Sequence, residues 1–487
     1  MNLIEIPKAS KELCIKAFKE NILNNFNLEN INKLASTGQL DQKYLRCMAW
    51  KIFLDAISPK DSLDKWKEDI IYQRTEYKIL SDKTKKQQEF FEEEDKKNTA
   101  YNYDIKSSYL KNKSIVYNPF RPEKETRNLI NLDLSRTLQE LSLFHDENIK
   151  NKLSHILYLW SLENSNIGYQ QGMNNILSII FLALYPYYFK NDKNEENNII
   201  NYEEDKDEDE ELYLFFHDED ELESDLYICF NKAMEKGIKI LYESEFNSKE
   251  EQNEYIKNIC LFDNELENII NKNEDTNAPL YIRSSMVEHE KLKVIDNKLY
   301  SHFKKIGLDC TIFLQRWIKC FFSFEFGFKD VLIIWDYIIS SNEIKKKYDF
   351  AKVDIIAISM LLRIRDYLFF CDQSQCFMIL LQYPKINNII ELISFSDMIK
   401  EAIKDLLSGI NNDFLENLTS FPLNHENNNK NKYNKIGSKE ISPPFAINNY
   451  EEGIEKLLNI FNKYHSLMEV NDQKEFHNVI QFFNKNK

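Results

Sequence analysis

Apolar residues recur at helical spacing along most of the 487-residue chain. Between residues 149 and 160 they follow offsets of 0, 4, 7, 8 and 11, which places them on one face of a helix: Ile149, Leu153, Ile156, Leu157 and Trp160. Helical spacing with offsets of 0, 3, 4 and 7 recurs at 314–321 and at 454–461. No stretch alternates apolar and polar residues over a convincing length. The pattern therefore predicts an all-α fold.

Three polar stretches interrupt this pattern. Residues 190–224 contain the dense acidic run 205–211, and we expect them to be solvated. Residues 244–297 are polar with scattered apolar positions. Residues 410–449 are rich in asparagine, which is typical of a linker, and a last helix is expected to begin near 450.

Charge and cysteine usage exclude several classes of function. The chain has 63 basic and 79 acidic residues and a net charge of −16, which argues against binding nucleic acid or anionic lipid. Its eight cysteines form no C-x-x-C pair, so we predict no metal site and expect reduced thiols. The longest apolar run, 176–185, is too short to span a bilayer. With no signal peptide or lipidation pattern at its ends, we expect a cytoplasmic protein without direct membrane insertion.

Glycine placement marks one local peculiarity. Two of only nine glycines, Gly168 and Gly172, bracket Tyr169, Gln170 and Gln171 between two helical segments. Glycine permits positive φ and close backbone approach, so a turn that presents the tyrosine and a glutamine is expected. The alternative is an ordinary helix C-cap at Gly168 followed by a loop.

A second local pattern lies upstream, at residues 130–136. If this segment is helical, Asp133 and Arg136 are i, i+3 neighbours while Ile130 faces elsewhere. The isoleucine would anchor the turn and the carboxylate would steer the guanidinium. A surface salt bridge without function is the ordinary alternative for such a pair.

Together these two patterns resemble the motifs of the TBC domain family of Rab GTPase-activating proteins, I-x-x-D-x-x-R followed by Y-x-Q-G. Further landmarks agree with an R-x-x-x-W helix and with an F-x-x-R-W…E-F…W-D block. We expect these landmark residues to pack helices and to satisfy buried polar groups: Arg46, Trp50, Arg316, Trp317, Trp335 and Asp336. Arg316 is expected to meet a carboxylate, either Glu325 or Asp336.

The resemblance implies a TBC-type multi-helical domain with low-complexity acidic and polar insertions. The chain then divides into an N-terminal helical extension at 1–41, a TBC domain at 42–390 with insertions near 190–224 and 244–297, a C-terminal helical extension at 391–409, an Asn-rich linker at 410–449, and a C-terminal helix and tail at 450–487.

The resemblance also implies a function. A Rab-family small GTPase in its GTP state would receive Arg136 as an arginine finger and Gln171 as a glutamine finger. Four residues would support substrate binding: Ile130, Asp133, Tyr169 and Gly172. The chain lacks G-x-x-x-x-G-K-[ST], so we expect no cofactor of its own. Mg-GTP belongs to the partner, and the chain is a GTPase activator rather than an enzyme with its own bound nucleotide.

Residues 360–366 and 381–384 most resemble the retromer-associated branch of the family, which implies recruitment to endosomal membranes in vesicle traffic. Asn118, Pro119 and Phe120 form a candidate retromer contact, because Pro119 stiffens the loop that presents Phe120. The alternative is that Phe120 packs inward to hold the loop. A catalytically silent Rab effector or a retromer-associated scaffold remains an alternative function.

Overall fold

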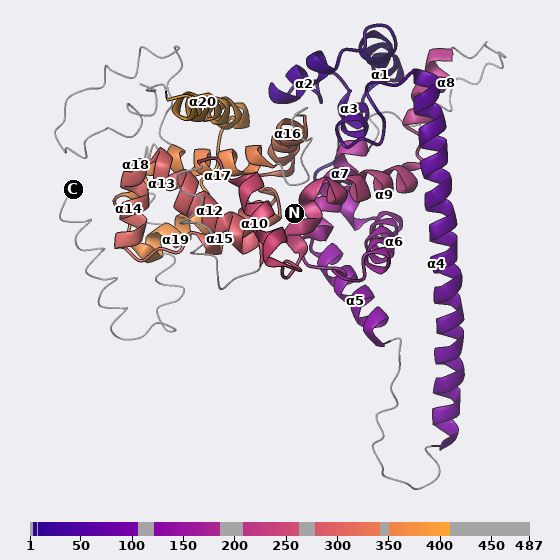
Figure 1. Cartoon of the computed structure of the whole chain (residues 1–487). Helices are drawn as coiled ribbons and strands as arrows, with labels where there is room; N and C mark the ends of the chain where they lie inside the picture. Colours follow the sequence, from indigo (N-terminus) through magenta and orange to yellow (C-terminus); the bar gives the residue numbers. More distant parts are fainter. Residues whose placement is uncertain are drawn as a thin grey trace. The chain divides into compact units, whose positions relative to one another are not determined.

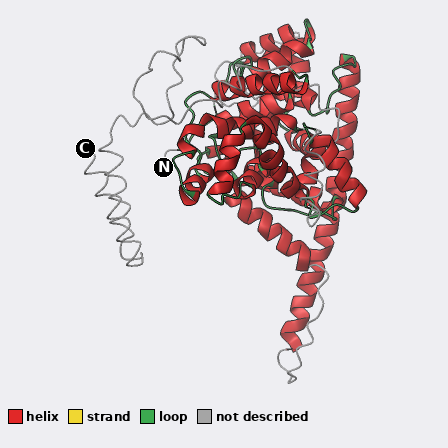
Figure 2. Ribbon diagram, turned by 60° about the vertical axis from the view of Figure 1, so that its left-hand side comes forward, coloured by secondary structure: helices red, strands yellow, loops and turns green. Residues whose placement is uncertain are grey.

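The computed structural model describes residues 3–6, 8–105, 121–185, 208–262, 278–340 and 350–409, without the side chains of residues 87–123. These residues form helices and loops and no strand apart from an isolated bridge between Ile4 and Leu141, so the all-α prediction is confirmed (Figure 2). Every described helix belongs to the same unit of the fold.

The helices are labelled in Figure 1. Their bounds are α1 Lys11–Phe18, α2 Leu28–Ser36, α3 Arg46–Phe53, α4 Leu63–Ile105, α5 Arg121–Ser135, α6 Glu147–Glu163, α7 Met173–Leu184, α8 Glu208–Phe216, α9 Leu222–Ala233, α10 Lys249–Ile259, α12 Pro279–Met286, α13 Lys293–Ile295, α14 Asn297–Lys305, α15 Thr311–Lys319, α16 Phe328–Ile339, α17 Ala351–Arg363, α18 Arg365–Leu368, α19 Gln373–Leu381 and α20 Ile389–Leu407.

Helix α7 is the centre of the part of the fold that carries both sequence motifs. Every residue of α7 except Asn175 is buried, which is expected of a helix that is apolar on all sides. It packs against α3, α6, α9 and α16, and α5 packs on α6 and α7. The motif at the end of α5 and the motif at the start of α7 are therefore held by the same group of helices.

A second core forms around α17, in which residues 353–362 are all buried. Helix α17 packs on α15 and α20, and α16 contacts α20 as well as α3 and α7. Helix α16 thus joins the two cores. Its Trp335 stacks on Trp50 of α3 with 5.7 Å between ring centroids.

The long helix α4, which begins at Leu63, was not singled out by the sequence patterns. Trp66, Ile70, Arg74 and Tyr77 are buried at helical spacing and form the stripe by which α4 packs on α9. Trp66 also donates its indole N–H to the carbonyl of Ser58 at 2.6 Å. Since Arg74 belongs to this stripe, the buried face of α4 carries a charge.

The expectation that residues 190–224 are solvated is wrong for residues 208–224, which form α8 and the start of α9. The acidic residues occupy the first turn of α8, where the helix dipole favours negative charge, and Glu210 lies 2.6 Å from the Lys11 ammonium. Tyr213 and Phe216, which follow, are buried, and Tyr213 packs edge-on against Phe18. Acidic composition therefore concealed an amphipathic helix.

Residues 244–297, expected to be a polar insertion, form helices in their described parts, 244–262 and 278–297. Helices α10 and α12 form there, and α12 contributes to the core. Arg283 of α12 is buried, and its Nε atom donates to Asp354 of α17 at 2.8 Å. Polar composition in this segment is therefore compatible with a place in the core, because the buried charge is paired.

Other expectations have mixed outcomes. Helices α1 and α2 lie within the predicted N-terminal extension, and α20 covers most of 391–409. The helical stripe at 314–321 ends early, since α15 stops at Lys319 and Phe321 has φ of +46°. The predicted linker and last helix, at 410–487, lie outside the described residues. Among the described helices, none has the length and apolar character required to cross a membrane.

Candidate functional site

The upstream motif lies where α5 ends. Ile130 and Leu134 are buried and hold the last turn of α5 against its neighbours. Asp133 is buried as well, and its Oδ1 atom forms an ion pair with Nη2 of Arg136. The Arg136 side chain is nevertheless 53% exposed. A buried carboxylate thus tethers an arginine whose remaining donors face outward.

Tyr169 connects the two motifs. Its hydroxyl donates to Asp133 Oδ2 at 2.8 Å, so both carboxylate oxygens of Asp133 have partners. Burial, and then the hydrogen bond to Asp133, raises the pKa of the Tyr169 phenol well above its usual range. The phenol therefore remains a donor at neutral pH, and Arg136 and the 168–172 turn are linked through a single carboxylate.

Asn174 and Thr137 complete this link. The side-chain oxygen of Asn174 accepts the Gly172 N–H at 3.0 Å, and its Nδ2 atom donates to Thr137 Oγ1 at 2.8 Å. The Thr137 hydroxyl in turn donates to the Asp133 carbonyl at 2.7 Å. Neither residue belongs to a motif, although Thr137 directly follows the first motif and Asn174 lies two residues after Gly172.

The turn before α7 has the conformation that its glycines predicted. Gly168 has φ of +67° and Gly172 has φ of +106°, both in the region that favours glycine. A Cβ atom at Gly172 would lie 3.1 Å from the Tyr242 hydroxyl and 3.3 Å from the Cys320 sulfur. The turn leaves Gln171 exposed, with no side-chain hydrogen bond to any described residue.

Tyr242 and Lys319, which are distant from this turn in the sequence, support it. The Tyr242 carbonyl accepts a hydrogen bond from Gln170 Nε2 at 2.5 Å, and the Tyr242 hydroxyl donates to the Lys319 carbonyl at 3.2 Å. The Lys319 ammonium lies 4.8 Å from the centre of the Tyr242 ring, and burial lowers its pKa. No sequence signal pointed to Tyr242 or Lys319, since neither belongs to a motif.

The exposed side chains of this site offer mainly hydrogen-bond donors. Arg136 offers a planar cation with several N–H groups, and Gln171 offers an amide that can both donate and accept. The carboxylate beside them, Asp133, is already engaged by Arg136 and Tyr169. The site is therefore suited to stabilise negative charge and to hold a water molecule on an atom that another molecule supplies.

The other landmark residues form structural contacts. Asp336 accepts hydrogen bonds from Arg46 Nε at 3.1 and 3.0 Å and from the Trp50 indole at 2.6 Å. Of the two carboxylates considered for Arg316, the partner is Glu325, at 2.8 Å from Nε. Trp317 packs against aromatic rings, with its centroid 4.9 Å from that of Phe313. The Asp336 contacts join α3 to α16, whereas these contacts of Arg316 and Trp317 lie within α15 or just after it.

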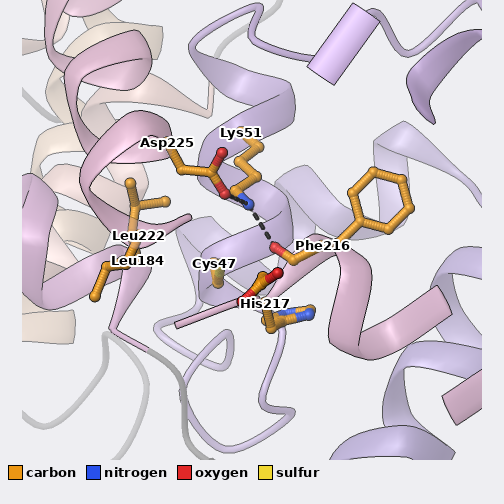
Figure 3. Close-up of a pocket in the computed structure, with 8 residues that line it drawn as sticks. Cys47, Lys51, Leu184, Phe216, His217, Leu222 and Asp225 are labelled. Atoms are coloured by element: carbon orange, nitrogen blue, oxygen red, sulfur yellow. Dashed lines mark hydrogen bonds and ion pairs between the residues drawn. The ribbon is translucent and has the colours of Figure 1, made fainter. Parts of the chain in front are cut away.

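One pocket elsewhere in the described residues also contains charged groups (Figure 3). Lys51 donates to Asp225 Oδ2 at 2.6 Å and to the Phe216 carbonyl at 2.5 Å. Asp225 is also held by Arg74, at 2.7 and 2.8 Å. The charges of Lys51, Arg74 and Asp225 compensate one another. These residues therefore form a buried ionic contact between helices rather than a ligand site.

Comparison with known proteins agrees with the fold. The chain belongs to the Rab-GTPase-TBC domain family, whose model matches residues 43–287 and 270–369.

Individual relatives are more distant. TBC1 domain family member 5 of Mus musculus is 25% identical over 388 residues, which cover 78% of this chain and 43% of that protein. The GTPase-activating protein GYP1 of Saccharomyces cerevisiae is 24% identical over 230 residues, covering 46% of this chain and 29% of that protein. The chain thus spans less than half the length of these relatives.

A solved structure shows the same fold. The crystal structure of the Ypt/Rab-GAP domain of Gyp1p matches with a TM-score of 0.51 and 19% sequence identity. The match covers 81% of this chain and 99% of that chain.

Proposed function

We propose that this chain accelerates GTP hydrolysis on a Rab-type small GTPase by inserting Arg136 and Gln171 into its active site. The observation that supports this most directly is the state of Arg136. Its guanidinium is tethered to the buried Asp133, yet its side chain is 53% exposed and adjoins a turn that exposes Gln171. A merely structural arginine would be expected to use more of its donors within the fold.

The mechanism follows from what slows a small GTPase. Negative charge gathers on the transferring phosphoryl group, and the attacking water is poorly held. The Arg136 cation stabilises that charge, and the Gln171 amide orients the water. Mg-GTP is carried by the partner, because the chain has no phosphate-binding glycine loop of the P-loop type. The network of Asp133, Tyr169 and Asn174 pre-positions both groups before the partner arrives.

The direct test is single-turnover GTP hydrolysis by a panel of GTP-loaded Rab proteins, with and without this chain. We expect an acceleration of about 10³–10⁵-fold for one or more of them, the range that an arginine finger can reach. A panel in which no member is accelerated contradicts the proposal. Binding of GTP-loaded Rab without acceleration indicates the alternative, a catalytically silent effector or scaffold.

Recruitment to endosomal membranes through retromer remains a prediction that rests on the sequence resemblance. Asn118, Pro119 and Phe120, the candidate contact, lie outside the described residues. Replacing all three by Ser-Gly-Ser tests the idea. Loss of retromer binding with intact hydrolysis in solution supports recruitment through this segment, whereas unchanged binding rejects it.

A further inference from the structure

The face of α5 that leads to Arg136 is apolar and exposed. Leu129 is 43% exposed and Leu132 is 58% exposed, although the buried anchors Ile130 and Leu134 lie on the same helix. Leu129, Leu132 and Arg136 are spaced i, i+3 and i+7, so they fall within an arc of about 60° around the helix axis. The two leucines and the arginine thus form one stripe, directed away from the packed face of α5.

The part of α5 that carries the two leucines has no charge on its exposed face. From residue 128 to residue 135 the only ionisable side chain is Asp133, which is buried. The other exposed positions in this interval are Asn128, Asn131 and Ser135. In a chain with 29% charged residues, such a neutral strip beside the outward-facing arginine is unusual, and the central regions of protein interfaces are depleted of charge in the same way.

Helix geometry determines how near the leucines lie to a partner that receives Arg136. At about 1.5 Å of rise per residue, Leu132 precedes Arg136 by ~6 Å and Leu129 by ~10 Å along the axis. A standard interface covers roughly 800 Å² on each partner, equivalent to a disc of about 16 Å radius. A partner whose active site receives Arg136 therefore covers both leucines as well.

We propose that Leu129 and Leu132 form an apolar docking contact for the GTPase, against an apolar surface beside its nucleotide pocket. This inference rests on the proposed function. The contact contributes binding energy that is the same before and during hydrolysis, and it favours GTPases that present apolar side chains at the matching position. Leu129 and Leu132 bind the partner, and the chemistry remains with Arg136 and Gln171.

The test separates docking from catalysis by steady-state kinetics with the GTP-loaded Rab as the varied substrate. Leu132→Asp and Leu129→Asp should each raise KM about tenfold or more, because burying an exposed leucine is worth about that factor and a buried unpaired carboxylate adds to it. The rate at saturation should stay within about twofold of wild type. Leu132→Gln, which keeps helix propensity and size, should show a smaller rise in the same direction.

A matched control lies on another helix. Ile71 of α4 is 53% exposed, and Ile71→Asp makes the same apolar-to-acid change at similar exposure, so its KM should equal that of wild type. Unfolding midpoints of all variants should match wild type. Unchanged KM in both leucine variants, or an equal rise in Ile71→Asp, overturns the docking contact.

Failure of the proposed function gives a different result. If wild type binds GTP-loaded Rab but stimulates no hydrolysis, the catalytic proposal fails, and the dissociation constants of the same variants still decide the docking contact. A tenfold weaker complex for Leu132→Asp then supports docking, and equal affinity rejects it. If wild type neither binds nor stimulates any Rab of the panel, both proposals are rejected.

Discussion

Two arginine–aspartate ion pairs in this fold differ in how much of the arginine side chain is buried. Arg74 and Asp225 form a buried pair, in which the arginine side chain is 6% exposed and holds the carboxylate through two nitrogens. Arg136 and Asp133 form a pair in which only the carboxylate is buried, and Nη2 is the single guanidinium atom that contacts it. An arginine that uses several of its N–H donors within the fold stabilises the fold. An arginine that uses a single donor keeps the others available to a partner.

The carboxylates of the two pairs, Asp225 and Asp133, also differ in the charge of their partners. Burial alone would raise the pKa of Asp225, but Lys51 and Arg74 together outweigh it and hold that pKa below its usual range. A carboxylate with two buried cationic partners has little freedom to rearrange. Asp133 instead shares its oxygens between Arg136 and the neutral Tyr169, which leaves the guanidinium free to turn toward a phosphate.

The largest effect is expected from the exposed pair. Arg136→Ala should lower stimulated GTP hydrolysis by at least ~100-fold, since an arginine finger contributes about 4–7 kcal/mol to the barrier, and Arg136→Lys should not restore it because lysine lacks the planar fork. Unfolding should be unchanged. The matched control is Arg127→Ala on the same helix, whose guanidinium lies 3.5 Å from the Tyr158 ring centre and which should retain hydrolysis. Equal losses in both variants would contradict a finger role for Arg136.

A change in the buried pair, Arg74 and Asp225, should alter the stability of the fold and leave the rate of hydrolysis unchanged. Arg74→Ala leaves Asp225 partly unpaired and should reduce the free energy of unfolding by ~3–5 kcal/mol, measured by urea titration. The folded fraction should retain wild-type hydrolysis per molecule. A variant with an unchanged urea midpoint would show that Lys51 alone compensates the carboxylate.

The next effect separates two neighbouring glutamines. Gln171→Ala should lower stimulated hydrolysis by about 100-fold, as removal of one positioned catalytic donor commonly does. A Rab whose own switch glutamine is replaced by leucine should still be stimulated by wild type, because Gln171 orients the water. Gln170→Ala removes only the hydrogen bond that holds the turn to the Tyr242 carbonyl, so it should lower the rate less than Gln171→Ala. Complete resistance of the Rab variant would mean that Arg136 acts without a glutamine finger.

Two tyrosine hydroxyls allow a closer comparison of the region around Arg136 with the buried region around Asp225. Tyr169 donates to Asp133 at 2.8 Å and Tyr77 donates to Glu223 at 2.7 Å. Each phenylalanine variant should lose ~1.5–3 kcal/mol of stability, the usual size for a hydrogen bond to a charged group. Only Tyr169→Phe should also lower the saturating hydrolysis rate, because it loosens the anchor of Arg136. If Tyr77→Phe lowers that rate equally, the linkage through Asp133 is not the cause.

A pH-dependent effect involves only the buried region. Burial, and then the charge of Lys51, lowers the pKa of the His217 imidazole to about 3. Because the unfolded imidazole titrates near ~6.5, the unfolded chain binds the extra proton first, and stability falls as pH drops below that value by ~1.4 kcal/mol per unit. Asp225, with its lowered pKa, acts in the same direction at lower pH. His217→Phe should flatten the slope of unfolding free energy between pH 6.5 and 4, and an unchanged slope would assign it to other groups.

Local patterns in the sequence predicted the elements that depend only on nearby residues. The spacing of Leu153, Ile156 and Trp160 predicted α6, because side chains three and four apart share a helix face whatever the rest of the chain does. The positive φ values at Gly168 and Gly172 followed likewise from what glycine alone permits. Composition was a poorer guide at 208–224 and 278–297, where charged residues are satisfied by partners more than 60 positions away, such as Asp354 for Arg283.

By itself, the sequence determined the helical class, the two motifs and their order, since these reside in residue types and short spacings. Only the tertiary structure decided how deeply each charged residue is buried and how it is paired. Arg74 and Arg136 cannot be told apart by type, and their environments differ because α9 brings Asp225 against one while the end of α5 leaves the other in solvent. Tyr242 and Lys319 likewise reach the 168–172 turn through packing of distant segments. Burial depends on every contact of the folded chain, so no local pattern contains it.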